Sequence, residues 1–202
     1  VKQAPVLRTG VEPGVSLYDH GLGSYVIALP APGAEVVASR AVAELVSALT
    51  FVSQLPDAKV VRLEVSDTGW LGSDRIAFNA AVQQGLYQQL VNFGCPVIAV
   101  LSGDALGADF VLAGCCDFMV CSAQGRYGVV DAQRGYFATD AEVSLLTERF
   151  GPVLAERLLQ SSRALSGAEL QRLGGCMPVL SGGEQAEYVQ QLAAGLAAKP
   201  QE

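Results

Sequence analysis

The chain has 202 residues, of which 50% are hydrophobic and 16% are charged, and its formal net charge is -7. This composition excludes an intrinsically disordered chain, and the length is typical of one well-buried domain. An acidic balance without a cluster of basic residues argues against binding to nucleic acid or to an anionic membrane surface.

The sequence also bears on location and on metal binding. No apolar run approaches the roughly 20 residues that span a bilayer, and residues 1–10 lack the apolar core of a signal peptide. We therefore expect a cytoplasmic protein. The cysteines are odd in number and show no paired spacing for zinc, so we expect no metal and reduced cysteines in the core. They are Cys95, Cys115, Cys116, Cys121 and Cys176.

The first half of the chain predicts a hairpin followed by a helix and a strand. Residues 1–14 lack periodicity, so we expect a loose terminus or linker there and a single domain over residues 15–202. The segments VSLYD and SYVIALP flank the glycine-containing turn His20–Gly23, which predicts an antiparallel pair. Apolar residues recur at helical spacing over 35–55, and the alternating segment KVVRLEV then predicts a strand.

The second half of the chain repeats the order of strand, turn and helix. Ser166 and Glu169 have the spacing of a capping box, which predicts the start of a helix. The other predicted elements are a helix over 76–93, a buried strand over 96–101, a helix from near Leu106, the strand DFMVC, helices over 141–150 and 152–160, a strand over 177–180 and a helix over 184–198. Repeated units of this kind predict an α/β fold with a mainly parallel sheet covered by helices.

Two loops follow an apolar strand, contain glycine and lead into a helix, which is where ligands bind in open α/β sheets. They span residues 69–74 and Ser102–Asp109. In the second loop, small residues let backbone N–H groups approach a ligand, so we expect it to bind an oxyanion. An ordinary tight connection is the alternative on spacing alone. The glycines match neither a dinucleotide fingerprint nor a phosphate loop.

From about Val15 to Lys199 the chain resembles the crotonase, or enoyl-CoA hydratase/isomerase, superfamily. Residues 95–113, CPVIAVLSGDALGADFVLA, resemble the strand, glycine turn and helix of that family. The shorter motifs CD, RYG and LSGAE follow in the same order as in family members. The resemblance implies crotonase-like repeated ββα units, here with a shortened C-terminal helical part. It also implies a homo-oligomer, by family habit a trimer, and a thioester substrate with no further cofactor.

In that family two backbone N–H groups polarise a thioester carbonyl and hold the charge of an enolate. The resemblance assigns these groups to Ser73 and Ala108. Ala108 and Asp109 stand where the family has glycines, so the shape of the pocket should differ. Asp109 facing the pocket would repel an enolate or, if protonated, donate a hydrogen bond to it. A favourable contact with the helix dipole is the alternative.

The two positions that carry glutamates in family hydratases hold Val111 and Asp131 here, which argues against a standard hydratase. Asp131 is the general base that we expect, because one carboxylate can shuttle a proton within an enolised acyl chain. A loop aspartate that caps a turn is the alternative. Arg75 could bind a substrate carboxylate, and Trp70 and Tyr127 could line an acyl or pantetheine channel. A surface arginine and simple aromatic packing are the competing interpretations.

Residues 107–112, GADFVL, resemble a glycine-rich turn followed by Phe-Val in one group of decarboxylases. These decarboxylases act on carrier-bound glutaconyl groups in polyketide β-branching. Those enzymes use a lysine and a histidine, which cannot be matched here. We therefore weigh two functions. The first is an enzyme, a decarboxylating lyase or an enoyl isomerase, acting on a thioester of coenzyme A or of an acyl carrier protein. The second is an inactive crotonase-like domain that binds an acyl carrier protein or stabilises a partner enzyme.

Overall fold

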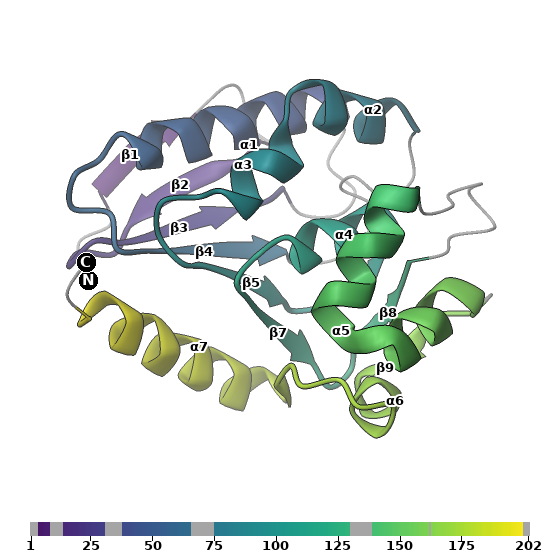
Figure 1. Ribbon diagram of the computed structural model, residues 1–202. Helices are drawn as coiled ribbons and strands as arrows, with labels where there is room; N and C mark the ends of the chain where they lie inside the picture. The colour runs from purple at the N-terminus through teal and green to yellow at the C-terminus, as the bar shows by residue number, and fades with distance from the viewer. Residues whose placement is uncertain are drawn as a thin grey trace.

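The computed structural model describes residues 4–8, 14–30, 38–65, 75–129, 139–161 and 163–199 (Figure 1). In these ranges a seven-stranded sheet has the order β1 (Ala4–Arg8), β2 (Ser16–Asp19), β3 (Ser24–Ala28), β4 (Val60–Val65), β5 (Val97–Leu101), β7 (Phe118–Ser122) and β10 (Val179–Leu180). A second sheet has the order β6 (Ala105–Leu106), β8 (Arg126–Gly128) and β9 (Leu165–Ser166). From β3 to β10 the neighbours in the larger sheet are parallel, whereas β1, β2 and β3 pair in antiparallel fashion.

Helices cover both faces of the larger sheet and one end of it (Figure 1). They are α1 (Ala38–Ser53), α2 (Arg75–Gln83), α3 (Leu86–Val91), α4 (Ala108–Gly114), α5 (Asp140–Gln160), α6 (Gly167–Arg172) and α7 (Gly182–Ala197). Figure 1 shows α1 on one face and α7 on the other, while α4, α5 and α6 gather at the end toward which β4 and β5 point. None of the helices in the described ranges is long and apolar enough to cross a membrane.

The alternation of side chains along the central strands divides the core in two. In β5, Ala99 and Leu101 join the large cluster that includes α1, whereas Ile98 and Val100 join a smaller cluster with Val189 of α7. Because successive side chains of a strand point to opposite faces, a run that is apolar throughout indicates a strand covered on both sides. The expected α/β class with a mainly parallel sheet is confirmed.

Four expectations need correction. The predicted loose terminus contains β1, which pairs with β2. The single helix over 76–93 is two helices, because Gly85 between them has φ of 68°, a left-handed conformation. Leu106 belongs to β6, and α4 begins two residues later. Cys176 is exposed, whereas the other four cysteines are buried as expected.

One side chain of α7 bonds to two neighbouring strands, at the end of β5 and in the middle of β7. Gln185 is 4% exposed, and its amide donates to the Leu101 carbonyl at 2.9 Å and to the Val120 carbonyl at 3.2 Å. Leu101 is the last residue of β5 and directly precedes the Ser102–Asp109 turn. The contact therefore connects α7 to the strand that carries the candidate site.

Replacing Gln185 by alanine should lower the free energy of unfolding by about 2 kcal/mol, because two hydrogen bonds are lost and two buried carbonyls lose a donor. Gln190→Ala on the same helix is the matched control, because Gln190 is exposed. It should change stability by less than about 0.5 kcal/mol. Urea denaturation measures both, and equal effects would contradict the role assigned to Gln185.

Candidate active site

The Ser102–Asp109 turn begins at the C-terminal end of β5, where hydrogen bonds from both sides hold the backbone. The Ser102 N–H donates to the Val65 carbonyl at the end of β4 at 3.1 Å, and the Leu101 carbonyl accepts from Gln185. Parallel strands end at the same edge of a sheet, which is the edge where α/β proteins bind ligands. The predicted position of the site is therefore consistent with the fold.

The middle of the turn is tied to the strand β8. Asp104 accepts from the backbone N–H of Arg126 at 2.9 Å and pairs with its guanidinium at 2.7 and 3.0 Å. One residue further on, β6 pairs in parallel with β8. A Cβ atom on Gly125 would lie 2.5 Å from the Gly103 carbonyl oxygen, so the two backbone segments approach too closely for a side chain there. The turn is thus held by both backbone and side-chain contacts.

Gly107 lies directly before α4, with φ of 59° and ψ of -128°. This conformation strongly favours glycine, because an L side chain in this region is strained. Its N–H donates to the Gly128 carbonyl at 2.8 Å, which fixes its orientation. Ala108 is the first residue of α4 and is 1% exposed. An N–H group in a first helical turn has no acceptor within its own helix, so this position suits a donor to a ligand.

The structure describes half of the residues predicted for the site. Asp109 lies in the first turn of α4, and Val111 lies in the middle of that helix; they are 1% and 0% exposed. Trp70, Ser73 and Asp131 lie outside the described residues. Arg75 begins α2, but its side chain is not among those described.

Tyr127 packs in the core. Its side chain is fully buried, its hydroxyl donates to the Ser122 carbonyl at 2.8 Å, and its ring centre lies 6.1 Å from that of Phe110. These contacts connect β8 to β7 and α4. They favour the packing interpretation of Tyr127 over a channel-lining role.

A cavity of about 380 Å³ lies beside α4 and contains residues that the sequence did not single out. Val111 lines it together with Tyr87 of α3 and Glu142 of α5. The other lining residues are Val82, Gln88, Val91, Asn92, Cys115, Thr139, Ala141 and Leu145. Most of this wall is apolar, as expected for a pocket that accommodates an acyl chain. The helical spacing of apolar residues predicts each helix but not which helices pack together, so it did not indicate that α3, α4 and α5 surround a cavity.

The polar groups in this cavity include two whose pKa values are perturbed. Burial raises the pKa of Tyr87 well above its usual range, with further increases from Glu142, Cys115 and Asp109. Burial likewise raises the pKa of the Cys115 thiol to about 12, and Glu142 adds to that shift. Both groups therefore stay protonated near neutral pH. Of the acidic residues that raise the pKa of Tyr87, Glu142 lines the cavity with it.

His20 and Lys59 lie away from this edge of the sheet. His20 precedes β3 and Lys59 precedes β4, so both lie at the N-terminal edge of the parallel strands. They line a different cavity of about 920 Å³, in which an Arg62 guanidinium nitrogen lies 3.1 Å from His20 Nδ1. Five residues of strand span roughly 16 Å, which separates this cavity from the Ser102–Asp109 turn.

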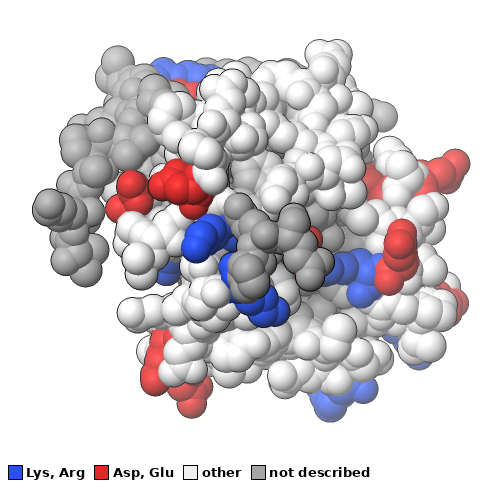
Figure 2. All heavy atoms as spheres, turned by 60° about the vertical axis from the view of Figure 1, so that its left-hand side comes forward, with Lys and Arg blue, Asp and Glu red and all other residues white. Residues whose placement is uncertain are grey.

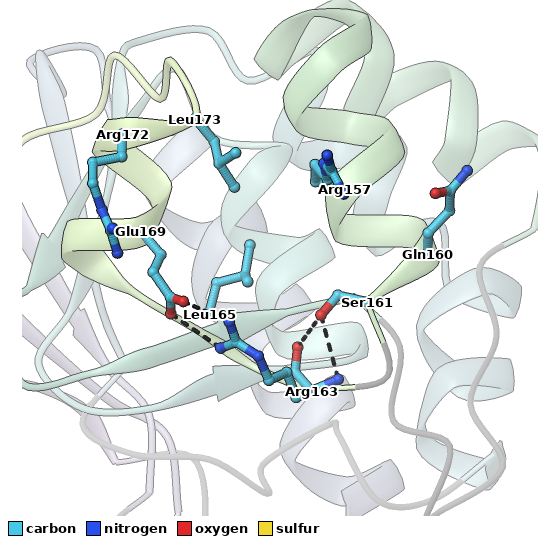
Figure 3. A pocket seen from close by; sticks show the side chains of 8 residues that line it. All are labelled: Arg157, Gln160, Ser161, Arg163, Leu165, Glu169, Arg172 and Leu173. Carbon is cyan, nitrogen blue, oxygen red and sulfur yellow. Dashed lines mark hydrogen bonds and ion pairs between the residues drawn. The ribbon is translucent and has the colours of Figure 1, made fainter.

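Arginines line a further cavity of about 420 Å³ between α5 and α6 (Figure 3). Arg157 reaches into it from α5 and Arg172 from α6, on either side of Leu165 and Leu173. Arg163 pairs with Glu169 through two hydrogen bonds of 2.6 and 3.1 Å, and this pairing lowers the pKa of Glu169 to about 2. With three guanidinium groups and one carboxylate, the cavity suits an anionic ligand.

On the face of the molecule that Figure 2 shows, lysine and arginine atoms form several separate groups, acidic atoms form others, and uncharged residues (white) make up most of the described surface. Among the described residues, no group of three or more histidine, cysteine, aspartate or glutamate side chains could hold a metal ion.

The amino-acid sequence of the chain matches a known protein family. The model of a family described as enoyl-CoA hydratase/isomerase matches residues 72–202. The bacillaene synthase decarboxylase PksI of Bacillus subtilis is 26% identical over 165 residues, covering 78% of this chain and 66% of that protein. The mitochondrial enoyl-CoA hydratase domain-containing protein 2 of Bos taurus is 34% identical over 91 residues, 45% of this chain and 31% of that protein. The chain thus spans less than two thirds of the length of these two relatives.

Solved structures share the fold. The ECH2 decarboxylase domain of CurF from Lyngbya majuscula superposes with a TM-score of 0.77 at 23% identity, covering 92% of this chain and 79% of that chain. An enoyl-CoA hydratase/carnithine racemase from Magnetospirillum magneticum gives a TM-score of 0.79 at 20% identity, covering 92% of this chain and 74% of that chain. The crotonase-like fold that the sequence motifs imply is therefore confirmed.

The conformation of Gly107 gives a stability test. Gly107→Ala should lower the free energy of unfolding by about 2 kcal/mol, because alanine is strained at this φ and ψ. Gly114→Ala, at the other end of α4, is the control. A Cβ there would lie 4.0 Å from its nearest neighbour, a Phe150 ring carbon, so this change should be neutral or stabilise by about 0.5 kcal/mol. Thermal unfolding compares them, and a neutral Gly107→Ala would refute the strained conformation.

Proposed function

This chain belongs to the enoyl-CoA hydratase/isomerase family, and we propose that it binds an acyl thioester and stabilises its enolate at the Ser102–Asp109 turn. The observation that carries the proposal is the conformation of Gly107, which directly precedes Ala108, the first residue of the buried helix α4, at the end of the turn that follows β5. In this proposal the Ala108 N–H and the Ser73 N–H donate to the thioester oxygen.

Such a site lowers the barrier to breaking a bond at the carbon next to the carbonyl. As that bond breaks, negative charge develops on the thioester oxygen, and donors that are already oriented stabilise it without reorganising. The cavity beside Val111 would receive the acyl chain, because its wall is largely apolar. The bond that breaks is either C–H, which leads to double-bond isomerisation, or the bond to a carboxylate, which leads to decarboxylation.

Proton transfer then requires a carboxylate, and Asp131 is the residue that the family resemblance points to. Val111 is fully buried where family hydratases have a glutamate, so the paired carboxylates that activate water are not formed at that position. Hydration is therefore the least favoured chemistry for this chain. The thioester is carried either by coenzyme A or by an acyl carrier protein.

A second candidate is a domain that binds an acyl carrier protein, or stabilises a partner enzyme, without catalysis. Two observations favour it. His20 and Lys59 lie at the opposite edge of the sheet, so neither replaces the histidine and lysine of the decarboxylases. The arginine-lined cavity of Figure 3 would suit the phosphate of a carrier-bound pantetheine arm.

Mass spectrometry and chromatography together test the proposed function. Purified protein is mixed with 3-methylglutaconyl and simple enoyl groups on a carrier protein and on coenzyme A. Intact mass reports the loss of carbon dioxide, and isomer-resolving chromatography reports a shifted double bond. We expect turnover of one substrate class, reduced by roughly 10²- to 10⁴-fold in Asp131→Asn, because a general base is removed.

Asp140→Asn is the control for this experiment, because Asp140 is an exposed carboxylate in the first turn of α5. It should leave turnover unchanged. Absence of turnover on every substrate, together with measurable binding of the carrier protein, would exclude the catalytic proposal and support the second candidate.

A further inference from the structure

Among the helices whose starts the structure describes, three begin with the same capping motif, but one of the three glutamates has different surroundings. Glu142 of α5, Glu169 of α6 and Glu184 of α7 each close a capping box with a serine or threonine three residues earlier. Glu169 is half-buried and Glu184 is exposed, whereas Glu142 is 7% exposed and lines the apolar cavity. A cap needs no burial, so capping alone does not explain the place of Glu142.

The capping contacts hold the Glu142 carboxylate in a fixed position. Glu142 Oε2 accepts from the Thr139 N–H at 2.7 Å and from the Thr139 hydroxyl at 2.9 Å. The helix that carries it packs on α4, where the ring of Phe150 stacks on that of Phe110 with centres 5.6 Å apart. A carboxylate fixed in this way loses little freedom when a reacting group approaches it.

The cavity lies against Val111 and Cys115, one turn beyond Ala108, which is not among the residues that line it. Ala108, Val111 and Cys115 are spaced by three and four residues, so they form one stripe of the helix. Val111 and Cys115 of this stripe line the cavity together with Glu142. Ala108 lies one turn before Val111, roughly 4.5 Å along the helix axis. An acyl chain whose carbonyl reached the Ala108 N–H would therefore extend past Val111 toward Glu142.

The neighbours of Glu142 are the two groups that burial keeps protonated. Tyr87 and Cys115 line the cavity with it, and each interacts electrostatically with Glu142. Neither is a base near neutral pH, because the pKa of each is raised by burial. Among the residues described as lining this cavity, Glu142 is the only carboxylate.

We propose that Glu142 is a catalytic acid–base residue that transfers the allylic proton of an enoyl thioester, which deepens the function proposed above and rests on it. A carboxylate oxygen of Glu142 takes a proton from the allylic carbon of the acyl chain. The electrons of the broken C–H bond form the dienolate, whose charge rests on the thioester oxygen at the Ala108 N–H. Glu142 then returns the proton to the other end of the allylic unit, so the double bond moves and no atom is lost. In this assignment Glu142, from α5, carries out the proton transfer that the family resemblance assigns to Asp131.

Hydrogen–deuterium exchange of an enoyl thioester tests this assignment. Crotonyl-pantetheine and 3-hexenoyl-pantetheine are incubated with the protein in D₂O, and exchange is followed by proton NMR while calorimetry measures binding. Glu142→Gln keeps the capping box, because glutamine also closes it, but cannot take up a proton. We expect exchange to slow by roughly 10²- to 10⁴-fold with the dissociation constant little changed.

Two further variants separate catalysis from folding. Glu184→Gln makes the same change in the exposed capping box of α7 and should exchange as fast as the unchanged protein. Glu142→Asp keeps a carboxylate and should retain more exchange than Glu142→Gln. Thermal unfolding of each variant shows whether the fold is intact.

The alternatives give distinguishable results. Rapid exchange by a folded Glu142→Gln, with loss of exchange in Asp131→Asn, would overturn the role of Glu142 and leave the proposed function standing. Equal slowing in Glu142→Gln and Glu184→Gln would reduce the effect to helix capping and overturn the proposal. A protein that neither binds nor exchanges these thioesters would contradict the proposed function, and the role of Glu142 with it.

Discussion

The candidate site depends on the hydrogen bonds that hold the backbone between β5 and α4. The strand end is fixed through Ser102 to β4 and through Leu101 to the side chain of Gln185, while Gly107 is fixed to Gly128 of β8. A small sheet of β6, β8 and β9 therefore supports the turn from one side and the large sheet from the other. A donor held in this way can meet developing charge without the cost of reorganising.

The same scaffold presents a carboxylate at the apolar cavity. Val111 makes α4 an apolar wall of the cavity at that point. The N-terminus of α5 meets this wall, and its capping glutamate lies at the cavity.

The sequence predicts the parts of this fold that depend on local chemistry. Alternating or continuous apolar runs predict β4 and β5, and the spacing of Ser166 and Glu169 predicts the start of α6. Contacts between distant segments could not be predicted in this way. The two-residue strand β6 has no pattern of its own and exists because β8 pairs with it. Glu142 carries no motif beyond a local cap, and only the packing of α3, α4 and α5 brings it to Val111. Ser73, Trp70 and Asp131 stay predictions.

The central claim is that the Ser102–Asp109 turn polarises a thioester carbonyl, and the vibrational frequency of that carbonyl reports it directly. A pantetheine enoyl thioester labelled with carbon-13 at the carbonyl is bound to the protein, and difference infrared spectroscopy records the C=O band. Donation from the Ala108 N–H should move the band of the bound thioester to lower frequency than in water. A bound thioester whose carbonyl band stays at its value in solution would contradict the account.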